Sequence, residues 1–225
     1  MTCGEGLVGK EFIRQATRYD IDALVDIYIE CFPERVNKVF GGPHRRAFIG
    51  DYLLFYLGWD PPSNWVYVRD GAVVGFIIVP CHYSPWKAML LHAQLFRWIS
   101  HCLTGKYGFP LHIVKQFFSG GFAFSSDPAI KRLQGKPYIH AIAVRPSDGK
   151  EPSQGLVGIG RRLLHWAIVD QRRKGIHSWW AVVQPAGTRF IPIWKRVGFK
   201  LYPISDGHFL ALLGDQDDNL RHSKC

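Results

Sequence analysis

The sequence contains no hydrophobic segment long enough to cross a lipid bilayer. Its most apolar helical region, residues 90–103, is interrupted by four polar or charged side chains, namely His92, Gln94, Arg97 and His101. A spanning helix needs about 20 consecutive apolar residues. The N-terminus also lacks a basic region followed by an apolar run, so the sequence predicts no signal peptide. We therefore expect a cytoplasmic protein with no transmembrane segment.

Cysteine is scarce and irregularly spaced. The five cysteines stand at positions 3, 31, 81, 102 and 225 and form no Cys-Xaa-Xaa-Cys pair. This odd number and scattered spacing argue against a disulfide scaffold and favour a reducing compartment. The sequence therefore predicts no metal centre.

Nucleic-acid-binding motifs are missing too, although the formal net charge is +10. No helix-turn-helix, zinc-finger or RNA-binding signature accompanies the basic residues, so we expect no nucleic-acid partner. The charge would suit the phosphates of coenzyme A, an acidic carrier protein or acidic lipid. It would equally suit a generic basic surface with no ligand.

The 225 residues, 47% of them hydrophobic, are enough for one domain with a substantial core. Neither an internal repeat nor a linker divides them, so residues 1–225 are treated as a single domain. Periodicity and turn signals predict a strand at 12–16, helices at 19–32 and 44–57, a hairpin of 65–69 and 72–79 across Asp70-Gly71, a helix at 189–197, and a closing hairpin of 199–202 and 208–213.

The most informative segment is residues 138–199. An apolar run at 138–144, ended by Pro146, predicts a strand. Three glycines follow. Residues 163–175 then predict a helix, with basic residues in the last turn and a glycine at the end. Residues 178–183 predict a second strand.

The three glycines, Gly155, Gly158 and Gly160, stand where a loop would lead into this helix. Glycine lets backbone amides crowd together, and amides at a helix N-terminus favour an anion. The pattern predicts a pyrophosphate cradle, to which Arg161 and Arg162 would add charge-assisted hydrogen bonds. The alternative is an ordinary strand-to-helix turn whose glycines only permit tight packing.

Four segments, in the same order, resemble parts of the GCN5-related N-acetyltransferases. Residues 142–146 and 155–164 resemble the acyl-CoA-binding core of that family. Residues 193–199 resemble its closing helix and Gly-Phe turn, residues 12–20 its first strand and helix, and residues 71–78 its second hairpin. The resemblance implies a single α/β domain with a mixed, mostly antiparallel central sheet flanked by helices.

The resemblance does not extend over about residues 80–136, where the family needs only a short turn. We expect a helical, aromatic-rich insertion at about 84–136, before the cofactor-binding strand, with helices at 85–104 and 111–118. Four roles stay open for it: a lid over the acceptor, a wall for a long acyl chain, a homodimer contact, or additional core.

The resemblance further implies direct transfer of an acyl group from an acyl-CoA thioester to an amine. In the family, the matching strand splays from its neighbour and its free backbone groups pair with the pantetheine arm. The implied cofactor contacts are Ile142, Ala143, Val144, Gln154, Gly155, Leu156, Val157, Gly158, Ile159, Gly160, Arg161 and Arg162. The expected donor is acetyl-CoA or a longer acyl-CoA, with acyl carrier protein as an alternative carrier.

His140 is the candidate base. Strand alternation places Tyr138, His140 and Val144 on one face, and an imidazole of near-neutral pKa can relay a proton from ammonium through water. Serotonin N-acetyltransferases, a branch of the resembling family, have two histidines in this strand, which match Tyr138 and His140. The alternative is a hydrogen-bonded structural histidine.

The general acid and the acceptor site are less clearly marked. Trp194 stands where the family often has an acidic tyrosine, so the thiolate would leave unaided or receive its proton from Tyr138 or Tyr202. Candidate acceptor-lining residues are Phe48, Tyr52, Gln184 and Trp194, of which the first two would otherwise serve the core. The acceptor is expected to be an amine-bearing small molecule or peptide.

Two rival functions remain at this point. One is a long-chain N-acyltransferase, dependent on acyl-CoA or acyl carrier protein, that uses the insertion as an acyl channel. The other is a non-catalytic protein that binds coenzyme A or a partner, which Trp194 in place of tyrosine would fit.

Overall fold

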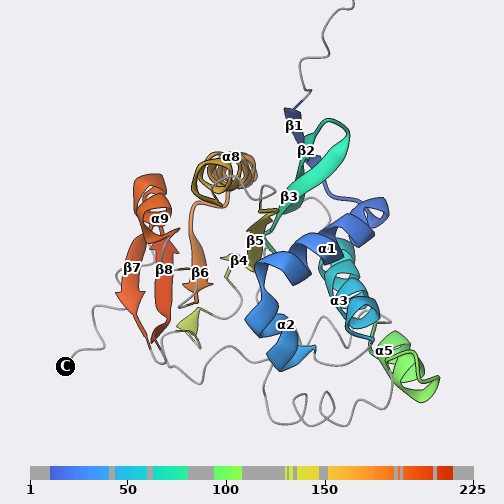
Figure 1. Cartoon of the computed structure of the whole chain (residues 1–225). Coiled ribbons are helices and arrows are strands. Elements are labelled where there is room, and N and C mark those ends of the chain that lie inside the picture. The colour runs from blue at the N-terminus through green and yellow to red at the C-terminus, as the bar shows by residue number, and fades with distance from the viewer. Residues whose placement is uncertain are drawn as a thin grey trace, which may run out of the picture.

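The computed structural model describes residues 11–40, 44–59, 63–80, 94–107, 130, 132–133, 136–146, 152–184, 187, 190–204 and 207–214. These residues form two four-stranded sheets with helices packed against them (Figure 1). The first sheet has the order β1-β2-β3-β5 and the second has the order β4-β6-β8-β7. Only the β4–β6 pair is parallel among these strands. The predicted α/β class and its mostly antiparallel pairing are therefore confirmed.

The strands lie close to their predicted positions. Those of the first sheet are β1 (Glu11–Gln15), β2 (Asn64–Arg69), β3 (Ala72–Ile78) and β5 (Ala141–Val144). Those of the second sheet are β4 (Tyr138–Ile139), β6 (Trp179–Val183), β7 (Lys200–Pro203) and β8 (Phe209–Leu213). The turn between β2 and β3 is the predicted one: Asp70 and Gly71 have φ angles of 52° and 77°, the left-handed values that a tight two-residue hairpin requires.

The described helices are α1 (Ile21–Cys31), α2 (Pro33–Val39), α3 (Arg45–Trp59), α5 (Gln94–Leu103), α8 (Pro152–Arg173) and α9 (Ile191–Val197), with a short 3-10 turn at Arg18–Asp20. Helix α2 is absent from the sequence-based prediction. Pro33 marks its start, because proline favours the first position of a helix.

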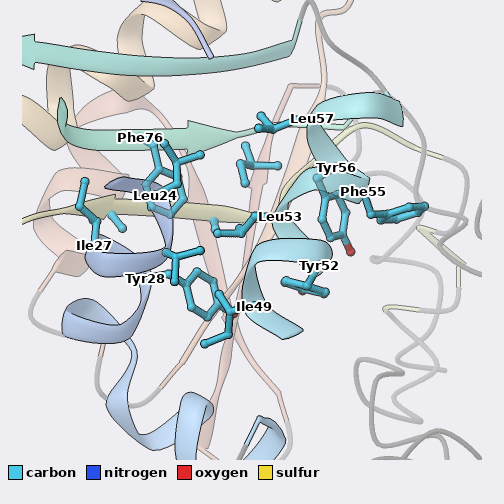
Figure 2. Close-up of a cluster of buried hydrophobic side chains, with 14 of the residues drawn as sticks. Leu24, Ile27, Tyr28, Ile49, Tyr52, Leu53, Phe55, Tyr56, Leu57 and Phe76 are labelled. Atoms are coloured by element: carbon cyan, nitrogen blue, oxygen red, sulfur yellow. The ribbon is translucent and has the colours of Figure 1, made fainter. Parts of the chain in front are cut away.

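The core between the first sheet and the N-terminal helices is rich in aromatic rings. Figure 2 shows Tyr28 of α1 close to Ile49 and Leu53 of α3, and Leu24 and Ile27 of α1 belong to the same cluster. Phe48 is buried in the same core, with its ring 5.5 Å from that of Trp98 on α5. Phe48 is therefore a core residue. The sequence had left two roles open for it, lining of the acceptor site and packing in the core, and the structure favours the second.

Helix α5 is held on α3 by a buried carboxylate. The side chain of Asp51 is only 3% exposed, and Nδ1 of His101 lies 2.8 Å from its Oδ2. Arg97 Nη2 is 3.0 Å from Oδ1, and the Tyr107 hydroxyl donates to Oδ2 at 2.5 Å. Lys106 Nζ lies 3.6 Å from the same Oδ2, so one carboxylate joins four side chains of the insertion to the N-terminal core. The remainder of the predicted helix at 85–104 and the whole of that at 111–118 lie outside the described residues.

No helix in the described ranges is both long enough and apolar enough to cross a membrane.

Candidate active site

A cavity opens where the two sheets diverge. Tyr138 and Ile139 pair with Trp180 and Ala181 of β6, whereas residues 141–144 pair with β3 of the other sheet. The strand therefore changes partner at His140, whose own N–H donates to the Ile78 carbonyl at 2.9 Å. The cavity beside this point has a volume of about 380 Å³ and is walled by residues 30–35, 138–142, 180–184 and parts of α9.

Strand β5 presents one free edge in this arrangement. Among the described strands it pairs only with β3, so its other edge lies on the side where the sheets separate. Ile142 lines the cavity and is partly exposed. Ala143 and Val144 are buried, and the Val144 carbonyl accepts a hydrogen bond from the Cys31 thiol at 3.2 Å. The splayed strand that the resemblance implied is present.

The predicted glycine loop is wrong in its local structure. Helix α8 begins at Pro152, so Gly155, Gly158 and Gly160 lie within its first turns and not ahead of them. Each internal glycine costs roughly 1 kcal/mol of helix propensity, which packing of the helix against the sheet overrides. A Cβ on Gly160 would lie 3.8 Å from Val144 Cγ2, whereas one on Gly158 would meet nothing within 4 Å.

Six other residues were predicted to form the cradle, and the structure describes the side chains of only three of them. The backbone of Gln154, Leu156 and Val157 is helical, but their side chains lie outside the described part of the structure. Arg161 is exposed. Arg162 Nη1 donates to Tyr67 Oη at 2.7 Å and to Glu11 Oε2 at 3.0 Å, so this guanidinium ties α8 to the first sheet. The buried Ile159 packs in the core beneath α8.

His140 lies at the centre of a buried polar cluster, which we define as Arg35, Tyr52, Tyr56, Tyr138 and His140. His140 is 7% exposed, its Nε2 lies 2.7 Å from Tyr52 Oη, and its Nδ1 lies 3.1 Å from Tyr138 Oη. The Tyr56 ring stacks on the imidazole at a centroid distance of 4.0 Å. Arg35 Nη2 donates to Tyr52 Oη at 3.2 Å. Both ring nitrogens of His140 are therefore within hydrogen-bonding distance of a tyrosine.

The expected common face of His140 and Val144 is not observed. Val144 and Ile142 pack in the cluster beneath α8, whereas His140 packs on Tyr52 and Tyr56 of α3. Strict alternation needs an unbroken strand. The change of sheet partner at His140 interrupts it, and the imidazole turns toward the opposite layer.

The near-neutral pKa expected for His140 is also wrong. Burial lowers its pKa well below the ordinary 6.5, and the nearby Arg35 cation lowers it further. Burial likewise raises the pKa values of Tyr52 and Tyr56 well above 10. At pH 7 the cluster therefore holds the Arg35 cation, a neutral His140 imidazole and the neutral phenols of Tyr52 and Tyr56.

This lowered pKa predicts a pH dependence of stability. Unfolded His140 takes up a proton as pH falls through about 6.5, while the folded form stays neutral, so protonation favours unfolding. The free energy of unfolding should fall by up to about 1.4 kcal/mol for each pH unit below 6.5 because of this residue alone. Urea unfolding of wild type and His140→Gln between pH 5 and 8 measures the difference. Equal slopes for the two proteins would show that the folded imidazole titrates normally.

Of the remaining predicted residues, Gln184 and Trp194 line the cavity with Tyr138 and His140. Tyr52 contacts two residues of the cavity wall, His140 and Arg35, and Tyr202 packs in the hydrophobic cluster around Trp180. Sequence reasoning missed two residues that line the cavity, Cys31 of α1 and Arg35 of α2. No local pattern marks them, since only the fold brings these helices against the strand.

Within the described residues no three His, Cys, Asp or Glu side chains are grouped to hold a metal ion.

Comparison with known proteins gives a match in fold alone. No family model and no curated protein sequence matches the chain. The solved structure of SsHAT superposes with a TM-score of 0.62 at 14% identity, covering 90% of this chain and 97% of that one.

A PaiA N-acetyltransferase from Thermoplasma acidophilum, solved with coenzyme A, superposes with a TM-score of 0.53 at 12% identity, covering 90% of this chain and 98% of that one. An agmatine N-acetyltransferase gives 0.51 at 15% identity, with 90% and 97% covered. The chain thus has the acyl-CoA N-acyltransferase fold. This likeness is one of fold, and it is the fold that the resemblance to the GCN5-related N-acetyltransferases implied.

Proposed function

We propose that this protein is an N-acyltransferase that moves an acyl group from an acyl-CoA thioester directly to an amine. The observation that carries the proposal is the cavity between the diverging strands β5 and β6. It has a free strand edge on one side and the His140 cluster in its wall. A strand edge supplies amides and carbonyls for a pantetheine arm, and the cluster supplies groups that exchange protons.

The cofactor would extend from the cavity to the N-terminal turns of α8. Ile142, Ala143 and Val144 would face the pantetheine arm through their backbone. Residues 154–161 would lie along the pyrophosphate, and the helix dipole together with the amides of the first turn of α8, which have no partner within the helix, would favour an anion there. Arg162 is left out of this contact set, because Glu11 and Tyr67 already bind its guanidinium.

Tyr138 and His140 are the proposed proton-transfer pair. Acyl transfer to an amine requires that the nitrogen lose a proton and that the sulfur gain one. Both residues line the cavity and lie within hydrogen-bonding distance of each other. Gln184 and Trp194 would contact the acceptor, since both also line the cavity.

The acyl donor is proposed to be acetyl-CoA, as no contact among the residues that the structure describes favours a longer chain. Helix α5 is the described part of the insertion, and it packs on α3 through Asp51. None of its described residues lines the cavity. The cavity wall carries Glu30 and Glu34, whose carboxylates are compatible with an amine as acceptor.

The direct test is an assay of the purified protein with acetyl-CoA and a panel of small amines and peptides. Release of coenzyme A thiol, together with an acetylated product detected by mass spectrometry, is the expected result. Tight binding of coenzyme A without turnover of any acceptor would instead favour the non-catalytic binding protein.

The cofactor assignment predicts a specific effect at Gly158. A side chain there has free space in the protein itself, so Gly158→Val should leave folding intact. It should weaken coenzyme A binding at least about tenfold, or 1.4 kcal/mol, because the side chain occupies the space of the pyrophosphate. Gly58→Val is the matched control, since Gly58 is also helical and also open but lies on α3. Equal affinities of both variants by calorimetry would remove the pyrophosphate from this position.

A further inference from the structure

Helix α5 is attached to the protein mainly through its polar side. Arg97 and His101 both reach Asp51 of α3, at 3.0 Å from Oδ1 and 2.8 Å from Oδ2 respectively. Trp98, which is 8% exposed, adds a ring contact with Phe48 at 5.5 Å. These contacts determine which face of α5 points toward α3.

The opposite face of α5 is apolar. Phe96, Ile99 and Leu103 are 77%, 46% and 82% exposed. Their spacing of three and then four residues places them on one side of the helix, away from Trp98 and His101. Figure 1 shows α5 at the edge of the molecule, beyond α3. A surface helix ordinarily turns its apolar stripe toward the core, so this reversed orientation indicates a partner outside the protein.

The residues around the apolar stripe are basic. Residues 94–103 contain no Asp or Glu. The whole insertion, residues 84–136, contains seven Lys or Arg and one Asp, hence a net charge of +6 out of the chain's +10. Arg97 and Lys106 are 45% and 44% exposed, whereas their partner Asp51 is 3% exposed. The cations therefore reach solvent and the carboxylate does not.

We propose that this face of α5 docks the protein on a lipid bilayer that contains anionic lipid. The docking surface, called the α5 surface below, consists of three apolar and two basic side chains: Phe96, Ile99, Leu103, Arg97 and Lys106. An amphipathic helix that lies flat in a membrane interface buries its apolar side chains below the headgroups, while Lys and Arg are attracted to the anionic lipids. One protruding helix meets this requirement, because a bilayer needs no groove of matching shape.

Charge favours a bilayer over a second copy of this chain. Two α5 surfaces facing each other would bring the Arg97 and Lys106 side chains of both copies together, and like charges oppose association. An anionic bilayer supplies opposite charge and a hydrocarbon layer at one place. The inference concerns attachment to a membrane surface and does not depend on acyl transfer.

Co-sedimentation of the full chain with lipid vesicles tests the proposal. Vesicles of equal parts phosphatidylcholine and phosphatidylglycerol should bind the wild type at least about tenfold more strongly than vesicles of phosphatidylcholine alone. Added salt should weaken this binding, because it screens the charges. The double variant Phe96→Ser, Leu103→Ser should bind at least about tenfold more weakly than the wild type. Its melting temperature should not change, since both side chains are exposed.

Trp166→Ser is the matched control. Trp166 is 46% exposed, like Ile99, but it lies on α8, which Figure 1 shows far from α5. This variant should bind the vesicles as the wild type does. Equal binding of the wild type to both kinds of vesicle, or wild-type binding by the double variant, would overturn the proposal.

Absence of vesicle binding would also overturn the proposal, and two further measurements would then identify what covers the α5 surface. A dimer that light scattering detects in the wild type and not in the double variant would assign the surface to a second copy. A lower melting temperature of the double variant would assign it to packing within the chain itself.

Discussion

Replacing Tyr138 by phenylalanine or His140 by alanine should lower turnover about 10²- to 10⁴-fold, the usual contribution of general acid–base catalysis. The two residues lie within hydrogen-bonding distance of each other and line the same cavity, so each substitution breaks the same proton path. Affinity for coenzyme A should barely change, because the proposed cofactor contacts lie on β5 and α8. Steady-state kinetics and calorimetry on the same preparations measure both quantities.

The pH profile separates the role of acid from that of base. If the pair donates a proton to sulfur, raising the pH to 9–10 should not rescue either variant. If the pair instead removes the amine proton, a higher fraction of free amine should restore part of the rate. A lower melting temperature with full turnover per folded molecule would make both residues structural.

Replacing Asp51 by alanine should cost about 3 kcal/mol of stability, the lower end of the range for breaking a buried ion pair. The carboxylate is almost fully buried and faces Arg97, His101 and Lys106, which would lose their common partner. Arg97 and Lys106 are almost half exposed, so water offsets part of the loss. Urea unfolding gives the free energy, and hydrogen exchange should show the amides of α5 opening first.

Asp26→Ala is the matched control for this second experiment. Asp26 pairs with Arg46, but both side chains are largely exposed, and such pairs contribute about 0–1 kcal/mol. A loss for Asp51→Ala no greater than that of the control would mean that α5 is held by apolar packing of Trp98 alone. Protection of α5 that persists in Asp51→Ala would lead to the same conclusion.

The sequence predicted the elements whose signals are local. Asp70 and Gly71 gave the hairpin between β2 and β3, because few residues adopt the left-handed backbone there. Alternation of apolar residues gave most strands of both sheets. The four segments that resemble the GCN5-related N-acetyltransferases, in the same order along the chain, predicted the fold, and the solved structures confirm this prediction.

Features that depend on packing were harder to predict. The start of α8 was missed because the glycines at 155, 158 and 160 weaken a helix locally, whereas contact with the sheet stabilises it. His140 and Tyr138 were found as candidates, but the pKa of His140 depends on burial among tyrosines of α3, about 85 residues earlier in the chain. Arg35 could not be found, since its role exists only when α2 lies against the strand.

The change of sheet partner at residue 140 also limits how this protein can be redesigned. Ile139 is fixed to β6 and Ala141 to β3, and the N–H of His140 itself is bound to Ile78. A substitution in this strand therefore perturbs both sheets together. Trp194 and Phe190, by contrast, reach the cavity from around α9 and belong to neither sheet. Libraries intended to broaden the range of acceptors should begin with those two positions.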